Sequence, residues 1–132
     1  MSIEQEILES CHVVAIVGLS SNVERPSNHV GSYLKSQGYK IIPINPGEKV
    51  ILEEVCYPNL TSVPDKVDVV DIFRRSEEVM PIINEALQIG AKAVWMQEGV
   101  LNEDAAQKAR SAGLKVVMDR CMFKEHARLH SR

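Results

Sequence analysis

Long apolar runs are missing from this chain of 132 residues. No stretch approaches the roughly 20 apolar residues of a membrane-spanning helix, so we expect no membrane partner. The N-terminal segment MSIEQEILES has neither a basic region nor an apolar core, and we expect no signal peptide. An excess of positive charge is also missing, because 15 Lys and Arg residues stand against 18 Asp and Glu residues. The resulting net charge of −3 argues against nucleic acid as the main partner.

Cysteine is scarce and scattered. Cys11, Cys56 and Cys121 form no CxxC pair, and their odd number does not suit a disulfide framework. This usage predicts a cytoplasmic location, where thiols stay reduced. With 45% hydrophobic and 25% charged residues and no low-complexity tract, residues 1–132 read as one ordinary globular domain. Two-fold association is the commonest form of homo-oligomer, which favours a homodimer if the chain self-associates.

The most informative segment is VVAIVGLSSNVERPS, residues 13–27. Five apolar residues run into Gly18, a polar loop follows, and a helical pattern begins near Ser27. A continuous apolar run bounded by glycine is typical of a strand buried on both faces. A strand, a glycine turn and a helix start together direct backbone N–H groups at one point, where a phosphate can bind.

The rest of the chain repeats this alternation. Strands are predicted at 13–17, 40–44, 55–57 (short), 67–73, 93–96 and 115–118. Helices are predicted near the N-terminus and at 27–37, 77–89, 102–113 and 121–129. This order predicts an α/β fold, a Rossmann-like doubly wound parallel sheet in three layers (α/β/α), with strand order 3-2-1-4-5-6 and a short strand 3. Pro43 lacks a backbone N–H, so the strand beside it should be short or absent.

Ligands of such sheets bind at the carboxyl ends of the strands. The segments expected there are 18–27, 45–49, 73–76 and 97–100. A nicotinamide or flavin dinucleotide would call for GxGxxG and an acidic residue after the second strand. Neither is present, although Gly31 could still let its helix lie close on the sheet. Coenzyme A carries an additional 3′-phosphate and calls for basic residues, which Arg25, Lys49, Arg74 and Arg75 supply.

Five motifs in order carry a family resemblance: GLSSNVERPSNHV, IIPINPG, VDVVDIFRRSEEV, AVWMQEGV and VVMDRCM. Together they resemble the free-standing CoA-binding Rossmann proteins, and these are similar to the N-terminal CoA domain of the succinyl-CoA synthetase alpha subunit and of ADP-forming acyl-CoA synthetases. The resemblance covers the chain from Cys11 to about Leu129. It implies coenzyme A or an acyl-CoA as the ligand, bound through its ADP moiety.

The same resemblance implies a set of binding residues. The phosphates would contact Gly18, Ser20, Ser21, Arg25 and Ser27. Asn45, Pro46 and Lys49 would flank the adenosine, Ile72 and Phe73 would contact its base, Arg74 and Arg75 belong to the basic cluster, and Gln97, Glu98 and Gly99 would form the inner edge. The phosphohistidine domain and the ATP-grasp partner of the synthetases have no counterpart here. We therefore expect a non-catalytic module, a sensor or carrier, rather than a ligase.

Several residues allow a second interpretation. Arg74 and Arg75 leave a strand in opposite directions, so at least one should be a solvated charge. Cys121 begins the last helix, but a histidine five residues on is poorly placed for a catalytic dyad, and a packed cysteine is expected. His126 and His130 have no third metal ligand and are expected to be solvated. An NAD(P)-dependent oxidoreductase, another nucleotide-binding domain and a pure interaction scaffold remain the alternatives.

Overall fold

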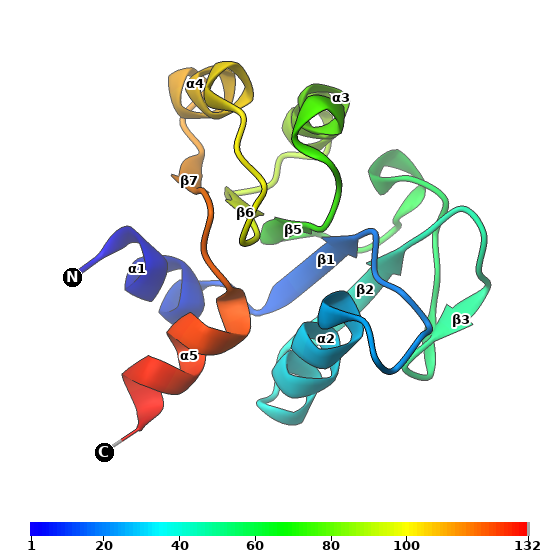
Figure 1. Cartoon of the computed structure of the whole chain (residues 1–132). Helices are drawn as coiled ribbons and strands as arrows, with labels where there is room; N and C mark the ends of the chain where they lie inside the picture. The colour runs from blue at the N-terminus through cyan, green and yellow to red at the C-terminus, as the bar shows by residue number, and fades with distance from the viewer. Residues whose placement is uncertain (132) are drawn as a thin grey trace.

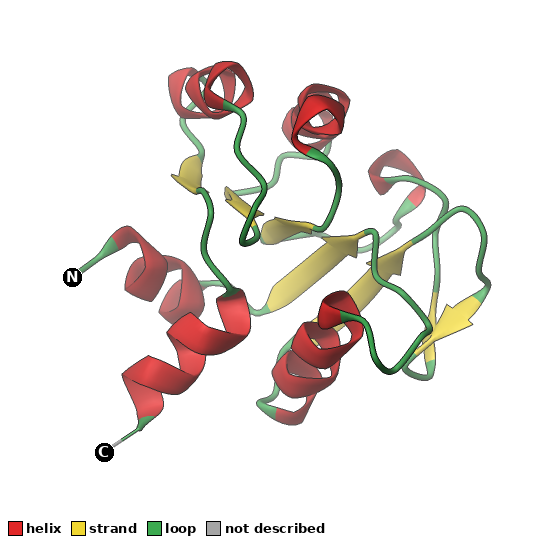
Figure 2. Ribbon diagram, in the orientation of Figure 1, coloured by secondary structure: helices red, strands yellow, loops and turns green. Residues whose placement is uncertain are grey.

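The computed structural model describes residues 1–131 and shows a parallel sheet with helices on both faces (Figures 1 and 2). The helices are α1 (Ile3–Ser10), α2 (Pro26–Ser36), α3 (Val79–Gln88), α4 (Glu103–Ser111) and α5 (Met122–His130), with two short 3-10 turns, η1 (Leu60–Ser62) and η2 (Ser76–Glu78). The strands are β1 (Val13–Val17), β2 (Lys40–Ile44), β3 (Val50–Ile51), β4 (Glu54–Val55), β5 (Val69–Ile72), β6 (Ala93–Met96) and β7 (Lys115–Val117).

The main sheet has five strands in the order β2-β1-β5-β6-β7, and all its pairings are parallel. At the centre, Ala15 of β1 lies between Ile42 of β2 and Val70 of β5. From β1 the chain first adds β2 on one side, and later strands are added on the other side, beginning with β5. This change of side creates a switch point at the carboxyl ends of β1 and β5. The predicted α/β doubly wound class is confirmed.

The short third strand differs from the prediction. Of residues 55–57, only Tyr57 pairs with the main sheet, through one parallel bridge to Ile44 at the outer edge of β2. The Tyr57 N–H donates to the Pro43 carbonyl at 3.0 Å, and the Asn45 N–H donates to the Tyr57 carbonyl at 2.9 Å. Pro43 has no N–H to offer this edge, which explains why the third strand does not extend along it.

Val55 belongs instead to an antiparallel hairpin, β3–β4, that the sequence did not predict. Its two turn residues, Leu52 and Glu53, have φ values of 54° and 65°. Such a turn is normally signalled by Asn or Gly, which are absent here. The hairpin is held against α2 by Lys35, whose Nζ lies 2.5 Å from the Leu52 carbonyl and 3.0 Å from the Glu54 carboxylate.

The apolar strands supply two cores, one on each face of the sheet. Helices α3 and α4 cover one face, and α1, α2 and α5 cover the other (Figure 1). Trp95 of β6 is fully buried on the second face. Gly31 brings α2 close to the sheet, because a Cβ there would lie 3.2 Å from Leu19 Cδ1 and 3.4 Å from Ile16 Cδ1.

Element ends depart from the predictions by one or two residues. Helix α2 begins at Pro26, whose fixed φ suits a first helical position. Glu77 and Glu78 lie in the 3-10 turn η2, ahead of α3, rather than in its first turn. Strand β5 begins at Val69, and just before it the Asp68 side chain accepts the backbone N–H groups of residues 12 and 13.

Candidate ligand-binding site

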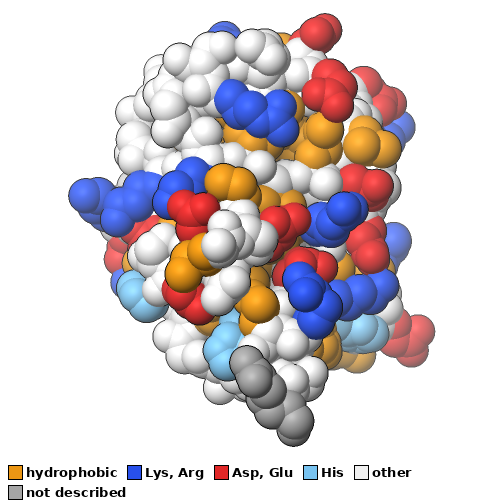
Figure 3. Space-filling model, turned by 90° about the vertical axis from the view of Figure 1, so that its left-hand side faces the viewer, with side chains coloured by type: hydrophobic (Ala, Val, Ile, Leu, Met, Phe, Trp, Pro, Cys, Tyr) orange, Lys and Arg blue, Asp and Glu red, His pale blue; other side chains and the backbone are white. Residues whose placement is uncertain are grey.

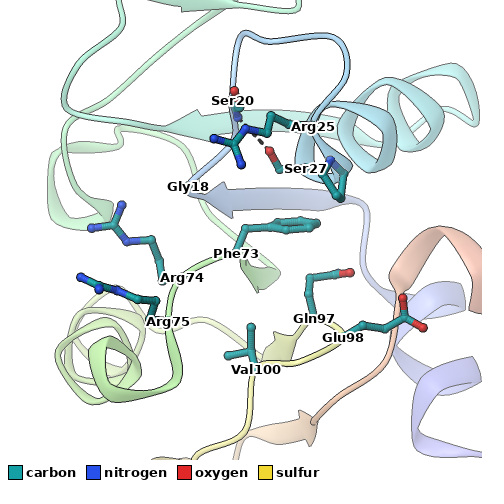
Figure 4. A pocket seen from close by; sticks show the side chains of 11 residues that line it. Gly18, Ser20, Arg25, Ser27, Phe73, Arg74, Arg75, Gln97, Glu98 and Val100 are labelled. Atoms are coloured by element: carbon teal, nitrogen blue, oxygen red, sulfur yellow. Dashed lines mark hydrogen bonds between the residues drawn. The ribbon is translucent and has the colours of Figure 1, made fainter.

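A cavity of about 450 Å³ opens at the carboxyl ends of β1, β5 and β6, beside the N-terminus of α2 (Figure 4). The lining residues come from all four of these places: Gly18, Ser20, Arg25, Pro26, Ser27, Phe73, Arg74, Arg75, Gln97, Glu98 and Val100. The cavity therefore lies at the switch point, where the sequence predicted the ligand.

Gly18 ends β1 in a conformation that only glycine adopts easily, with φ of +87°. A Cβ at this position would lie 2.3 Å from the Phe73 carbonyl oxygen, which is a backbone atom. The Gly18 N–H donates to the Ile44 carbonyl at 3.0 Å. Glycine is thus required here for two reasons. The turn needs a positive φ, and the backbone of Phe73, just after β5, leaves no room for a Cβ.

The loop after Gly18 is tied to the first turn of α2. The Ser20 N–H donates to Ser27 Oγ at 2.9 Å, and Asn28 Nδ2 donates to the Ser20 carbonyl at 2.8 Å. Ser27 and Asn28 are both buried polar residues, each 5% exposed. Arg25 occupies the N-cap position of α2 and its side chain caps no backbone N–H. The positive end of α2 therefore faces the cavity without a capping side chain.

Three arginines border the cavity. Arg74 Nε lies 3.5 Å and Arg75 Nη2 3.3 Å from the Glu78 carboxylate. The hydrogen bond from Arg75 and the charge of Arg74 hold the pKa of Glu78 below its usual value. Within residues 1–131, Arg25 takes part in no ion pair. The local charge is positive although the chain is net acidic, and such a charge favours an anionic ligand.

The inner wall carries a buried polar pair. Gln97, at the end of β6, is 3% exposed, and its Nε2 donates to Asp71 Oδ1 of β5. Asp71 is fully buried, and this burial raises its pKa to about 7, against the hydrogen bonds from Gln97 and the backbone. A carboxyl group of this kind was not anticipated, although an Asp in the middle of the apolar run VDVVDIF was visible in the sequence.

The loop that follows Gln97 is held in place by two residues that do not line the cavity, Lys124 and Asp119. Glu98 Oε1 pairs with Lys124 Nζ of α5 at 3.0 Å. The Gly99 N–H donates to Asp119 Oδ1 at 2.8 Å, and Gly99 has a positive φ of 84°. Gly99 shapes this loop but does not line the cavity.

A second cavity of about 400 Å³ adjoins the first and shares Gly18 and Arg74 with it. Pro46 lines this second cavity rather than the first. Asn45 sits behind the wall, where its Nδ2 donates to the Leu19 carbonyl at 3.0 Å and its Oδ1 accepts the Gly47 N–H at 2.8 Å. Asn45 therefore holds two loops together.

Three other predicted residues lie outside both cavities. Ser21 is exposed and its hydroxyl donates to Glu48 Oε2 at 3.2 Å. Lys49 is exposed in the loop before β3. Ile72 is fully buried in the core on the α3–α4 face of the sheet. Pro26 and Val100 also line the first cavity; both belong to the predicted segments 18–27 and 97–100, but neither was named as a contact, because neither residue type signals one by itself.

Cys121 and the two C-terminal histidines lie away from this cavity. Cys121 is the N-cap residue of α5 and half-buried. His126 is 5% exposed, and its Nδ1 lies 2.6 Å from the Tyr33 hydroxyl, so the prediction of a solvated His126 is wrong. Burial lowers the pKa of His126. Its ring stacks on His130 at 4.1 Å between centroids. Within residues 1–131, no cluster of three or more potential ligands could hold a metal ion.

The face on the left-hand side of Figure 1 mixes charges of the two signs (Figure 3). Ion pairs join Lys115 to Glu6 at 3.3 Å and Arg128 to Glu125 at 2.7 Å. No single-sign surface of the kind that nucleic acids require is visible on this face. In the part of the chain that the structure describes, no helix is long and apolar enough to cross a membrane.

Sheet order, switch point and glycine turn place the chain in the class of Rossmann-like α/β domains. Within this class it belongs to the CoA binding domain family, whose profile matches residues 12–127. The family resemblance seen in the sequence is confirmed.

Three individual proteins are similar to this chain in sequence or in structure. The uncharacterized protein YneT of Bacillus subtilis is 36% identical over 123 residues, covering 93% of this chain and 91% of YneT. The ADP-forming acetate–CoA ligase II of Archaeoglobus fulgidus is 33% identical over 98 residues, covering 73% of this chain but only 15% of the ligase. A hypothetical protein from Pyrococcus horikoshii has the same fold with a TM-score of 0.95 and 39% identity, covering 99% of this chain and 94% of that one.

Proposed function

We propose that this protein binds coenzyme A, or an acyl-CoA, through its ADP moiety at the carboxyl edge of the sheet. The observation that carries the proposal is the convergence of Gly18, the uncapped start of α2 and three arginines on one cavity of about 450 Å³. Membership of the CoA binding domain family supports the choice of ligand.

The diphosphate would lie over the Gly18 turn. Ser20 and Ser27 border it with hydroxyl groups, and the first turn of α2 offers backbone N–H groups and a positive dipole end. Arg25, free of ion pairs within residues 1–131, would add a charge-assisted hydrogen bond. Ser21 would join this group only by turning its hydroxyl away from Glu48.

The 3′-phosphate and the adenosine would occupy the junction of the two cavities. Arg74 lines both of them, and Arg75 lines the first. Pro46 offers an apolar surface in the second cavity, and Phe73 offers a half-buried ring in the first. Lys49 lies in the neighbouring exposed loop and would contribute long-range attraction. Ile72, the residue before Phe73, would support the site from the core on the α3–α4 face.

We propose a binding module without catalytic activity of its own, a sensor or carrier, in the cytoplasm and with a homodimer as the expected assembly. The nicotinamide alternative is less well supported. A dinucleotide site holds the ribose with an acidic residue after the second strand, and this chain has Asn45 there, with both ends of its side chain already hydrogen-bonded.

The test is thermal unfolding with coenzyme A, 3′-dephospho-CoA, acetyl-CoA and NAD, each in excess. A ligand present at 100 times its dissociation constant stabilises the folded state by about 2.7 kcal/mol, which raises the melting temperature by several degrees. We expect a shift with coenzyme A that shrinks when the 3′-phosphate is missing. A shift with NAD and none with coenzyme A would refute the proposal and favour the oxidoreductase alternative.

A further inference from the structure

Asp71 is the one feature of the site that phosphate binding does not explain. It is fully buried in β5, and its neighbours in register are Ile16 on β1 and Trp95 on β6. Among residues 1–131, Asp71 Oδ2 is the single buried side-chain nitrogen or oxygen without a hydrogen-bond partner. A carboxyl group in such a position costs stability, so a stable core alone does not account for it.

The other carboxyl oxygen, Oδ1, accepts a hydrogen bond from Gln97 Nε2. Gln97 directly follows β6, two residues after Trp95, and it lines the cavity beside Phe73 (Figure 4). The Gln97 carbonyl oxygen makes no hydrogen bond within residues 1–131, and it is not among the fully buried atoms. The NH₂ end of the Gln97 amide is therefore held by Asp71, and the carbonyl end is accessible to a ligand.

The chemistry of the Asp71–Gln97 pair determines which end of the Gln97 amide faces Asp71. An ionised carboxylate only accepts hydrogen bonds, so it must face the NH₂ group of the amide rather than the carbonyl. We propose that Asp71 is a positioning residue that holds the Gln97 amide with its carbonyl oxygen toward the cavity, so that the inner wall selects a ligand carrying an N–H or O–H donor at that point.

This inference rests on the proposed function and specifies it further. The ADP part of coenzyme A presents mainly acceptors beside the phosphate region, whereas the pantetheine arm carries a hydroxyl and amide N–H groups. Gln97 stands on the opposite wall of the cavity from Arg25 and Ser20, the residues assigned to the diphosphate (Figure 4). The donor that Gln97 accepts would thus belong to the arm, and Asp71 would favour whole coenzyme A over its nucleotide fragment.

The experiment measures the affinity of two ligands by calorimetry at pH 8, where Asp71 is mainly ionised. The ligands are coenzyme A and 3′-phospho-ADP, which is the same molecule without the arm. The variants are Asp71→Asn, Gln97→Met and the double variant, because a positioning residue must act through its partner. Asp68→Asn is the matched control, since it removes a carboxylate next to β5 but at the opposite end of the strand.

We expect the wild type to prefer coenzyme A, and each single variant to reduce that preference roughly tenfold, which is the effect of one hydrogen bond. The double variant should lose no more preference than Gln97→Met alone, and Asp68→Asn should leave it unchanged. The inference would be overturned if a variant lost affinity equally for both ligands. It would also be overturned if Asp71→Asn still changed the preference for coenzyme A in the Gln97→Met background.

Two results separate this inference from the proposed function. If the wild type binds coenzyme A and 3′-phospho-ADP with equal affinity, the inference is wrong and the proposed function stands. If the wild type binds neither ligand, the proposed function is wrong and the inference falls with it. Thermal unfolding of every variant shows whether each one is folded before its affinity is compared.

Discussion

Replacing Asp71 by Asn should change how the stability of this protein depends on pH. Asp71 is fully buried, and burial raises its pKa in the folded state to about 7 from the ordinary value of 3.8. In the unfolded chain the side chain is solvated and titrates near its ordinary value. Asn has nearly the same size and offers Gln97 either an acceptor or a donor instead of an acceptor only, and it carries no charge at any pH.

Between about pH 4 and pH 7, the folded chain holds a proton on Asp71 that the unfolded chain has released. Stability therefore falls as the pH rises through this window. The rise of this pKa from 3.8 to about 7 corresponds to a free energy of about 4 kcal/mol. The contribution of the neutral Asp71 is complete below about pH 4 and lost above about pH 7.

The assay is urea denaturation of wild type and Asp71→Asn at several pH values from 4 to 8, followed by the fluorescence of Trp95, the single tryptophan. Other titrating groups are the same in both proteins, so they cancel in the difference of the unfolding free energies. We expect this difference to rise by about 4 kcal/mol in favour of the Asn variant across the range. A difference that stays constant with pH would refute the raised pKa and the reasoning from burial.

Three further predictions follow from single positions. Gly18→Ala should lower the unfolding free energy by more than Gly38→Ala, because both glycines have positive φ but only Gly18 would bring its Cβ against backbone, 2.3 Å from the Phe73 carbonyl oxygen; equal losses in denaturation would contradict this. Arg25→Ala should weaken coenzyme A binding by about 1.5–3 kcal/mol with the melting temperature unchanged, and calorimetry that finds full affinity would move the phosphate elsewhere. Glu53→Gly should stabilise the protein by about 1 kcal/mol, since Glu53 is exposed with φ of 65°, and a lower melting temperature would contradict it.

Much of the architecture could be predicted because its signals are local. The apolar runs at 13–17 and 93–96 became strands with the expected ends, and the helix predicted from residue 102 starts there, capped by Asn102. Gly18 identified the turn at the switch point, since its neighbours along the chain already read as strand and helix. These features depend on residues close together in the sequence, and a single chain displays them directly.

The parts that could not be predicted depend on distant residues. The β3–β4 hairpin lacks a turn signal, and its strained residues are held by Lys35 from α2. His126 was expected in solvent because its contacts come from a distant residue, Tyr33. The Tyr33 ring stacks on Phe123, and the Tyr33 hydroxyl contacts the ring nitrogen of His126, and nothing near His126 in the sequence shows this. The coupling of Asp71 to Gln97 spans 26 residues, and only the parallel pairing of β5 with β6 brings the two together.

Two departures from what stability alone would favour surround the same cavity. Arg25 stands at an N-cap position where a capping residue would contribute about 1 kcal/mol, and Asp71 puts an ionisable group where an apolar side chain would fit. Departures of this kind are expected at functional sites, where local preferences are given up for binding. Their convergence argues for a ligand more strongly than the cavity does by itself, because a plain surface hollow would give no reason for a buried carboxyl group beneath it.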